Sequence, residues 1–293
     1  MLNAVLPSFV LFLREGLEAS LIVSILCATL RQLGQTQQIR AVWTGVVLAV
    51  LGALGGAAVI YFTVRQYDGT IGQTIFETAT YLIAVVVLTY MTFWMQQHSR
   101  SLKAEIAAKA STAGSGFAFG LLAFSSVGRE GLESAVFTLA FAFDTNAMLL
   151  LLGALLGVGA AVGLCFMIYR LGYRLDFRLF FRVMGILLII FAAGLLGDAV
   201  QNLQALGWLN VGTHQLWNTG HILSEESTFG DLLHGLIGYS EAPTVLQTLA
   251  YIAYLAVAGG FFWRLTRKPP QLAARRAPAA SPASAAKPAT EHA

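Results

Sequence analysis

The sequence is poor in charge and in cysteine. Only 11% of its 293 residues are charged, whereas 57% are hydrophobic and the mean hydropathy is +0.69. A soluble domain carries about 25% charged residues, so the composition excludes an ordinary soluble protein and indicates an integral membrane protein. Cys27 and Cys165 both fall within apolar runs and predict no disulfide framework. Motifs for nucleotide phosphates, Ser-His nucleophiles and Cys-based zinc sites are lacking, so the sequence predicts neither an ATP-driven pump nor an enzyme.

Seven apolar runs are long enough to cross a bilayer, which takes a helix of about 20 residues. We therefore expect an all-α integral membrane fold with seven transmembrane helices. The first run has no basic segment before it and carries three charges, so we expect it to stay in the mature chain rather than be cleaved as a signal. The runs are 4–30, 41–64, 71–95, 117–143, 146–169, 183–203 and 244–264.

Basic residues are distributed unevenly among the connections between these runs. Those after the first, third, fifth and seventh runs hold fifteen of the eighteen Lys and Arg residues. Because such residues accumulate on the cytoplasmic side, we expect an N-out, C-in multi-pass protein of the cell inner (plasma) membrane. The net charge of +3 is therefore a topology signal and indicates no nucleic-acid partner.

A charged motif occurs twice, as Arg-Glu-Gly-Leu-Glu at 14–18 and again at 129–133, 115 residues later. The copies lie in the first and fourth runs, and an offset of three spans inverts topology. We therefore expect a 3+3 inverted repeat, with halves at about 4–95 and 117–203 and the helix at 244–264 as an addition. Transporters built in this way place their site near the bilayer midplane, between the halves.

The motif residues are spaced to share one helix face: Arg14, Glu15 and Glu18, and likewise Arg129, Glu130 and Glu133. Six unpaired charges at mid-membrane would cost on the order of 15–20 kcal/mol, so they must meet one another or water. Four carboxylates against two guanidiniums leave a negative surplus, and carboxylate oxygens suit hard cations. The alternative is that each motif is an Arg–Glu ion pair that fixes helix packing.

At these motifs the chain resembles the oxidase-coupled iron permeases, the family of the fungal high-affinity iron permease and the bacterial EfeU-type transporters. The likeness extends to "FETATYLIAVVVLTYMTFWM" and to the segment from "LWNTGHILSEES" through the last run, and covers roughly residues 5–265. It implies a high-affinity permease for ferric or ferrous iron, with Arg14 and Arg129 as essential motif members and iron as substrate rather than a bound cofactor. The iron-handling carboxylates that the resemblance implies are Glu15, Glu18, Glu130 and Glu133. At position 218 this chain has Asn, where members of the family are expected to carry an acidic residue.

Further candidates lie outside the motifs. Glu77 and Asp198 are candidate relays within spans. The outer segment 204–243 contains neither Lys nor Arg, and its length favours a function such as an iron entrance or a docking site for a periplasmic iron-binding or oxidase/peroxidase partner. Its candidate entrance residues are His214, His221, Glu225, Glu226 and Asp231.

The domain organisation follows from these observations. Residues 1–265 form the permease domain, the connection 96–116 is read as a solvated helix, and the Ala/Pro/Ser-rich residues 266–293 form a disordered cytoplasmic tail. Two other functions remain open: transport of another divalent cation such as manganese, and a membrane-embedded carboxylate metalloenzyme. Against the enzyme, the spans lack the Glu-x-x-His spacing of di-iron helical sites.

Overall fold

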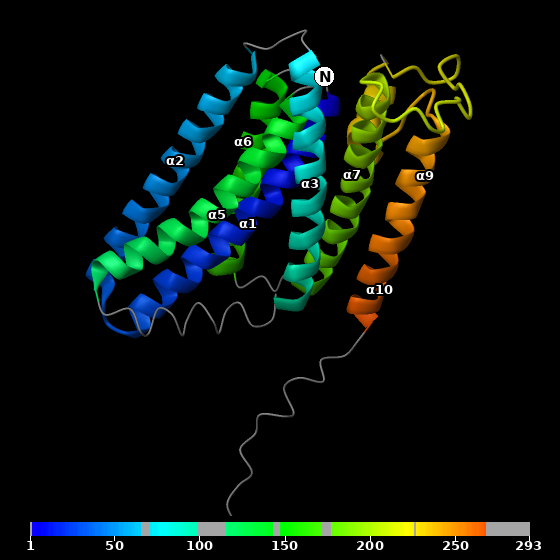
Figure 1. The fold of residues 1–293 in the computed structure, drawn as a ribbon. Coiled ribbons are helices and arrows are strands. Elements are labelled where there is room, and N and C mark those ends of the chain that lie inside the picture. The colour runs from blue at the N-terminus through cyan, green and yellow to red at the C-terminus, as the bar shows by residue number, and fades with distance from the viewer. Residues whose placement is uncertain are drawn as a thin grey trace, which may run out of the picture.

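The computed structural model describes the chain as a bundle of long helices (Figure 1). In the described part, extended residues pair only at one isolated bridge, between Gln215 and Thr244. The solvated helix expected at 96–116 lies mostly outside the described residues, and the tail at 266–293 does so almost entirely. The described residues are 2–65, 71–98, 115–142, 147–171, 177–225 and 227–267.

Each predicted apolar run coincides with a helix to within three residues at either end, except that the helix of run 183–203 begins six residues earlier, at Phe177. A π-helical turn at Leu255–Gly259 joins the last two helices into one rod. The helices are α1 (Leu2–Gln32), α2 (Ile39–Arg65), α3 (Ile71–His98), α5 (Gly116–Ala142), α6 (Ala147–Leu171), α7 (Phe177–Ala205), α9 (Val245–Tyr254) and α10 (Gly260–Arg267).

Five helical segments in the described chain are long and apolar enough to cross a membrane: those in α2, α3, α6 and α7, and the α9–α10 rod. Helices α1 and α5 have 31 and 27 residues, but each carries the three charges of its motif. Apolar side chains face outward along the bundle, as at Leu155, which is 73% exposed. A bilayer covers such a surface favourably, whereas water does not.

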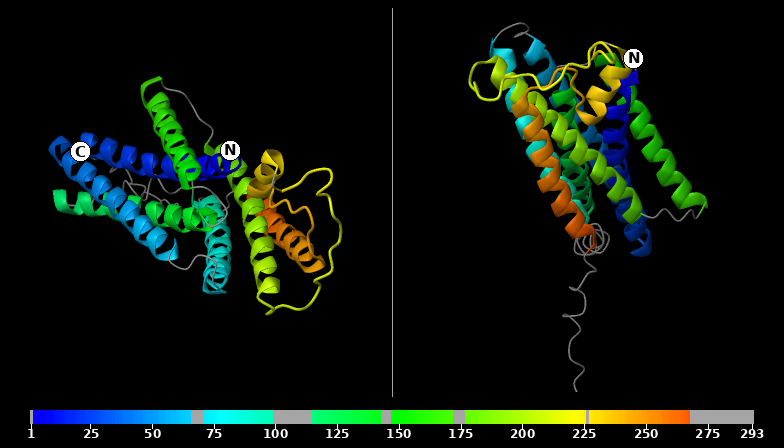
Figure 2. Two further views of the ribbon diagram at one scale, coloured as in Figure 1. Left: turned by 90° about the horizontal axis from the view of Figure 1, so that it is seen from above. Right: turned by 90° about the vertical axis from the view of Figure 1, so that its right-hand side faces the viewer.

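The bundle is built around α1. This helix packs most extensively on α6 and also contacts α5, while α5 packs on α2, and α3 and α9 pack on α7. One core cluster includes Leu11 of α1, Tyr81 of α3, Phe137 of α5 and Phe191 of α7. The apolar cluster thus joins the two charged helices to α3 and α7, which lie beside them (Figures 1 and 2).

Small residues set the close approach of the two main helix pairs. A Cβ added at Gly16 of α1 would lie 2.9 Å from the Cβ of Ala161 in α6. A Cβ added at Gly131 of α5 would lie 2.8 Å from the Cβ of Ala53 in α2. The glycine inside each charged motif therefore allows its helix to touch a neighbour, which fixes the direction in which the motif's charged side chains point.

The segment between α7 and α9 lies at the same end of the bundle as the N-terminus (Figures 1 and 2). It contains the short helix α8 (Thr228–Ile237), which packs on α1 and α7. Ser227 caps its first turn by accepting a hydrogen bond from the Gly230 N–H, and Gly238 ends it with a φ of 67°. That left-handed conformation favours glycine.

Candidate metal-handling site

In α1, one arginine holds both glutamates of its own motif. The Nε of Arg14 donates to Glu18 Oε1 at 3.1 Å, and its Nη1 donates to Glu15 Oε1 at 3.2 Å. All three side chains are 2–3% exposed. The helical spacing of one and four residues produces this fork, because residues four apart lie above one another on a helix.

In α5, the second motif repeats the chemistry with a different geometry. Arg129 donates from Nη2 and from Nε to Glu130 Oε1, at 2.8 and 3.2 Å, and its Nε lies 3.6 Å from Glu133 Oε1. Glu130 is 3% exposed, but Arg129 is 45% exposed. Its guanidinium also lies over the ring of Trp94 in α3, 5.0 Å from the ring centroid.

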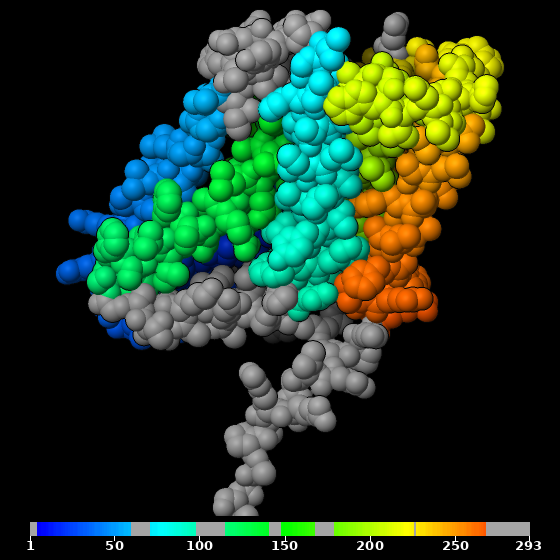
Figure 3. Space-filling model, viewed as in Figure 1, coloured from blue at the N-terminus to red at the C-terminus, as the bar shows by residue number. Residues whose placement is uncertain are grey.

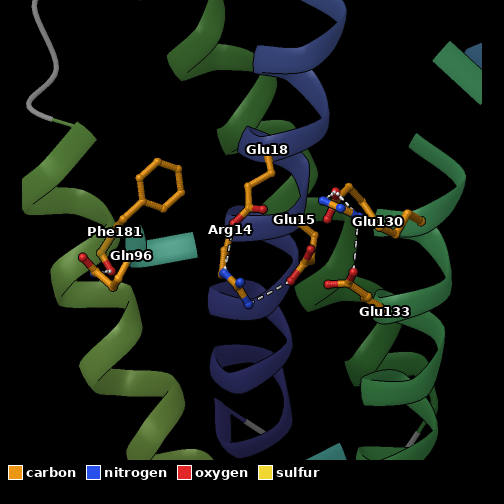
Figure 4. A network of polar contacts seen from close by, with 8 residues as sticks. Arg14, Glu15, Glu18, Gln96, Glu130, Glu133 and Phe181 are labelled. Carbon is orange, nitrogen blue, oxygen red and sulfur yellow. Dashed lines mark hydrogen bonds and ion pairs between the residues drawn. The ribbon is translucent and has the colours of Figure 1, made fainter. Parts of the chain in front are cut away.

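The two motifs converge across the α1–α5 contact. Glu15, Glu18 and Glu130 each offer a carboxylate oxygen, and these atoms lie within 4.8 Å of one another. Figure 4 shows Glu15, Glu130 and Glu133 extending into the space between the two helices. A cation-binding arrangement requires such a set of oxygens from separate segments, because residues on one helix cannot surround an ion.

Several oxygens of this cluster are buried without a hydrogen-bond partner among the residues that the structure describes. They are Oε2 of Glu15, Glu130 and Glu133. An unpaired buried polar atom is costly and is uncommon in folded proteins. In each of these glutamates the other oxygen faces an arginine, so each has one oxygen paired and one unpaired among the described residues.

The two predicted relay residues occupy other helices. The hydroxyl of Tyr81 donates to Glu77 Oε1 at 2.9 Å, within α3. Asp198 of α7 faces α8, with its Oδ2 4.0 Å from Nε2 of His234. Nδ1 of that histidine is 2.8 Å from the carbonyl oxygen of Tyr239, so the imidazole links α8 and its following loop to α7.

The predicted entrance residues remain on the outer segment. His214 and His221 are exposed, Asp231 lies in the first turn of α8, and Glu226 lies outside the described residues. Glu225 forms a reciprocal pair with Glu241: its N–H donates to Glu241 Oε2 at 3.0 Å, and its own Oε1 accepts from the Glu241 N–H at 2.7 Å. These two carboxylates therefore stabilise the conformation of the outer segment through hydrogen bonds to its backbone.

Sequence reasoning missed two residues that contact the site and its candidates. Trp94, over Arg129, and Tyr81, bonded to Glu77, both lie in the third apolar run, where they read as ordinary apolar positions. A one-turn spacing within α3 relates Tyr81 to Glu77 and would have found that pair. Trp94 and Arg129 lie on different helices, and the spacing of residues along the chain does not predict a contact of that kind.

The comparisons with known proteins agree with this chemistry. A family model described as "Iron permease FTR1 family" matches residues 5–267. The chain belongs to this family. The match covers every described helix except the first three residues of α1, so family membership applies to the whole bundle rather than to one motif.

Curated relatives are similar over most of their length. Proteins named "Ferrous iron permease EfeU" from Escherichia coli O6:K15:H31 (strain 536 / UPEC) and from Escherichia coli O157:H7 are 36% and 34% identical over 255 residues, which is 85% of this chain and 92% of each relative. The protein of that name from Yersinia pestis is 34% identical over 255 residues, 85% of this chain and 90% of its own. No solved structure matches.

Together the family and the apolar helices identify an iron-permease-family protein that crosses the membrane several times. The relatives are named as permeases, which are transporters rather than enzymes.

Proposed function

We propose that this chain takes up iron across the inner membrane, with Glu15, Glu18, Glu130 and Glu133 as the ligands that hold the ion in transit. The observation that carries the proposal is the convergence of three buried carboxylates from two helices within 4.8 Å. Arg14 and Arg129 orient these carboxylates by binding one oxygen of each. The partnerless Oε2 atoms of Glu15, Glu130 and Glu133 are then directed to the cation.

Iron fits this donor set as substrate, not as a resident cofactor. Carboxylate oxygens are hard ligands that accept ferrous and ferric ions alike. The name of the relatives supports ferrous iron as the first species to test. Four glutamates and two arginines have a formal charge of −2 when ionised, and an entering cation offsets this surplus.

The bundle is proposed to be a seven-span inverted repeat. If the two halves correspond, α1, α2 and α3 match α5, α6 and α7, and the contact of α1 with α6 must match that of α5 with α2. Those are the two most extensive helix contacts. The register supports the correspondence: Gly16 and Gly131 are 115 positions apart, and their partners Ala53 and Ala161 are 108 apart.

A second pair of contacts follows the same two offsets. An added Cβ at Gly153 of α6 would meet the carbonyl oxygen of Val5 in α1, and one at Gly45 of α2 would meet that of Gly120 in α5. Again 108 positions separate the glycines and 115 separate the carbonyls. Two matching registers support a repeat whose halves meet at the carboxylate cluster and alternate its access between the two sides.

The route to the cluster is proposed to begin at the outer segment. With the N-terminus outside and the C-terminus in the cytoplasm, α8 and the acidic loop around Glu225 face the periplasm, where an iron-binding or oxidase/peroxidase partner supplies the ion. Glu77 and Asp198 are proposed as relays toward the cluster. Their positions on α3 and α7, the helices packed beside α1 and α5, support this role.

Uptake of radioactive iron by proteoliposomes tests the proposal. We expect Glu15→Gln and Glu130→Gln to abolish uptake at equal protein abundance, because each removes a ligand charge from a different helix. Glu241→Gln is the matched control, since it makes the same change in the outer loop. Excess manganese added as competitor should leave uptake intact if iron is the substrate. Normal uptake by both motif variants would contradict the proposal.

A further inference from the structure

The two motifs are chemically alike but differ in exposure. The side chain of Arg14 is 2% exposed, and that of Arg129 is 45% exposed. Arg129 lies about halfway along α5 (Gly116–Ala142), a depth at which lipid is a poor neighbour for a guanidinium. The neighbouring exposed side chains on this face of α5, Leu121 and Leu132, are apolar, so it is the Arg129 guanidinium itself that requires water or protein beside it.

An opening between α3 and α5 lies on this side. Helix α5 packs extensively on α2, less on α1 and least of the three on α3. In the space-filling view α1 is visible between α5 and α3 (Figure 3). Ser125, one turn before Arg129, is exposed. We call this opening, with Ser125 and Arg129 on one side and Trp94 on the other, the α3–α5 recess.

Arg129 stands between the recess and the carboxylates. Its Nη2 and Nε hold Glu130 Oε1, while the same guanidinium lies 5.0 Å from the centroid of the Trp94 ring. Trp94 lies near the end of α3, two residues before Gln96, whose side chain donates a hydrogen bond to the carbonyl oxygen of Phe181 in α7, at 3.1 Å (Figure 4). That bond ties this end of α3 to α7, whereas Arg129 has a long and half-exposed side chain, so we assign the movement to the arginine.

The contact with Glu130 is the stronger of the two, because Glu130 is buried and accepts two hydrogen bonds from Arg129. Withdrawal of the guanidinium from an empty site would leave a buried carboxylate without its counter-charge. When a cation occupies the cluster it supplies that charge, and the cation–π contact with Trp94 then stabilises the displaced arginine. Arg14, enclosed with both of its glutamates, has no such freedom.

We propose that Arg129 is the moving arm of a gate between the carboxylate cluster and the α3–α5 recess, and that Trp94 is the positioning residue that holds this arm aside while the ion passes. The gate rests on the proposed function, because it assumes that an ion occupies the cluster. The recess lies toward the end where α3 stops and α5 begins, which the basic residues assign to the cytoplasm. The gate is thus the inner one, through which iron leaves.

Thiol labelling tests whether the recess contains water, without any measurement of transport. In a background with Cys27→Ala and Cys165→Ala, the variant Ser125→Cys should react with a charged, membrane-impermeant thiol reagent applied to inside-out vesicles. The matched control is Leu155→Cys, an exposed apolar position about a third of the way along α6, which we expect to face lipid. We expect labelling of the first and none of the second. Protection of Ser125→Cys, by lipid or by a second copy of the chain, would overturn the inner gate.

Uptake kinetics test the role of Trp94. Trp94→Leu should lower the maximal rate of iron uptake about fivefold, the factor that a lost cation–π contact predicts, with KM within about twofold, because the carboxylate ligands are intact. Trp94→Phe keeps an aromatic face and should restore most of the rate. Trp263→Leu, which removes the ring beneath Arg267 at 4.5 Å, is the matched control.

The outcomes separate the gate from the transport function. A reduced maximal rate of iron uptake in Trp94→Leu, with nearly unchanged rates in Trp94→Phe and Trp263→Leu, supports the gate. A Trp94→Leu that transports like Trp263→Leu, or a Trp94→Phe as slow as Trp94→Leu, overturns the role of the ring. If the parent protein itself takes up no iron, the proposed function fails, whereas the labelling of Ser125→Cys still decides whether the recess contains water.

Discussion

Arg14 and Glu18 form an ion pair one turn apart on α1, with Nε and Oε1 3.1 Å apart and both side chains 2% exposed. The pair lies in the centre of the bundle, where Arg14 also holds Glu15. Its counterpart Arg129 is half exposed. Identical residue types thus occupy a closed site in α1 and an open one in α5.

This difference predicts unequal effects on stability. Arg14→Gln leaves two buried carboxylates without their counter-charge and should lower the free energy of unfolding by about 3–5 kcal/mol. Arg129→Gln also removes the counter-charge of the buried Glu130, but water can reach the half-exposed position of Arg129, so its cost should be smaller, about 1–2 kcal/mol. Thermal unfolding of the purified variants in one detergent compares them directly. Equal losses would show that the exposure difference has no energetic consequence.

The motif glycines predict a steric effect. Gly16→Ala and Gly131→Ala each place a Cβ within 3 Å of an alanine on the neighbouring helix, and such overpacking costs about 1–3 kcal/mol. Gly159→Ala is the control, because a Cβ there would meet nothing within 4 Å. We expect the melting temperature to fall in the first two variants and to stay unchanged in the third. A melting temperature unchanged in the motif variants would contradict the close helix contacts.

Membrane topology yields a prediction from the basic residues. Alkaline phosphatase folds only outside the cytoplasm, so a fusion after Arg267 should be inactive and a fusion within the outer segment, after Leu223, should be active. A fluorescent protein fused after Arg267 should fluoresce. The reverse pattern of activities would overturn the N-out, C-in orientation and with it the assignment of the recess to the inner side.

The reciprocal pair of Glu225 and Glu241 predicts local order in the outer loop. Glu241→Ala removes the carboxylate that accepts from the Glu225 N–H, and loss of a charge-assisted hydrogen bond should speed amide exchange there about tenfold or more. Glu241→Gln keeps an acceptor oxygen and should retain most of the protection. Hydrogen exchange followed by mass spectrometry measures both. Unchanged exchange in Glu241→Ala would mean that other contacts order the loop.

Much of the bundle could be predicted from the sequence because lipid imposes simple rules. Long apolar runs must be helical in a bilayer, and all seven coincide with helices. Spacing within one helix also predicted that Arg14, Glu15 and Glu18 share one face, and the hydrogen bonds of Arg14 to both glutamates agree with it. Predictions of this kind succeed because they depend on a single regular helix.

Contacts between side chains of different helices could not be predicted from the sequence. Nothing in the spacing of the second motif indicates that Arg129 lies half exposed against Trp94, because that depends on how far α3 stands from α5. The same holds for Glu225 and Glu241, sixteen positions apart in a loop that has no periodicity. The repeat predicted that Glu15 and Glu130 approach each other. The distance between them depends on the helix contacts at Gly16 and Gly131, which the sequence does not reveal.

The central claim is that carboxylates from α1 and α5 hold one and the same iron ion. A double-mutant cycle on iron binding by the purified protein tests this most directly, with Glu15→Gln, Glu130→Gln and the double variant measured in one buffer. Because both glutamates act on one ion, we predict strongly non-additive losses, with a coupling of about 1 kcal/mol or more. Additive losses would show that the two helices act at separate sites and would contradict the claim.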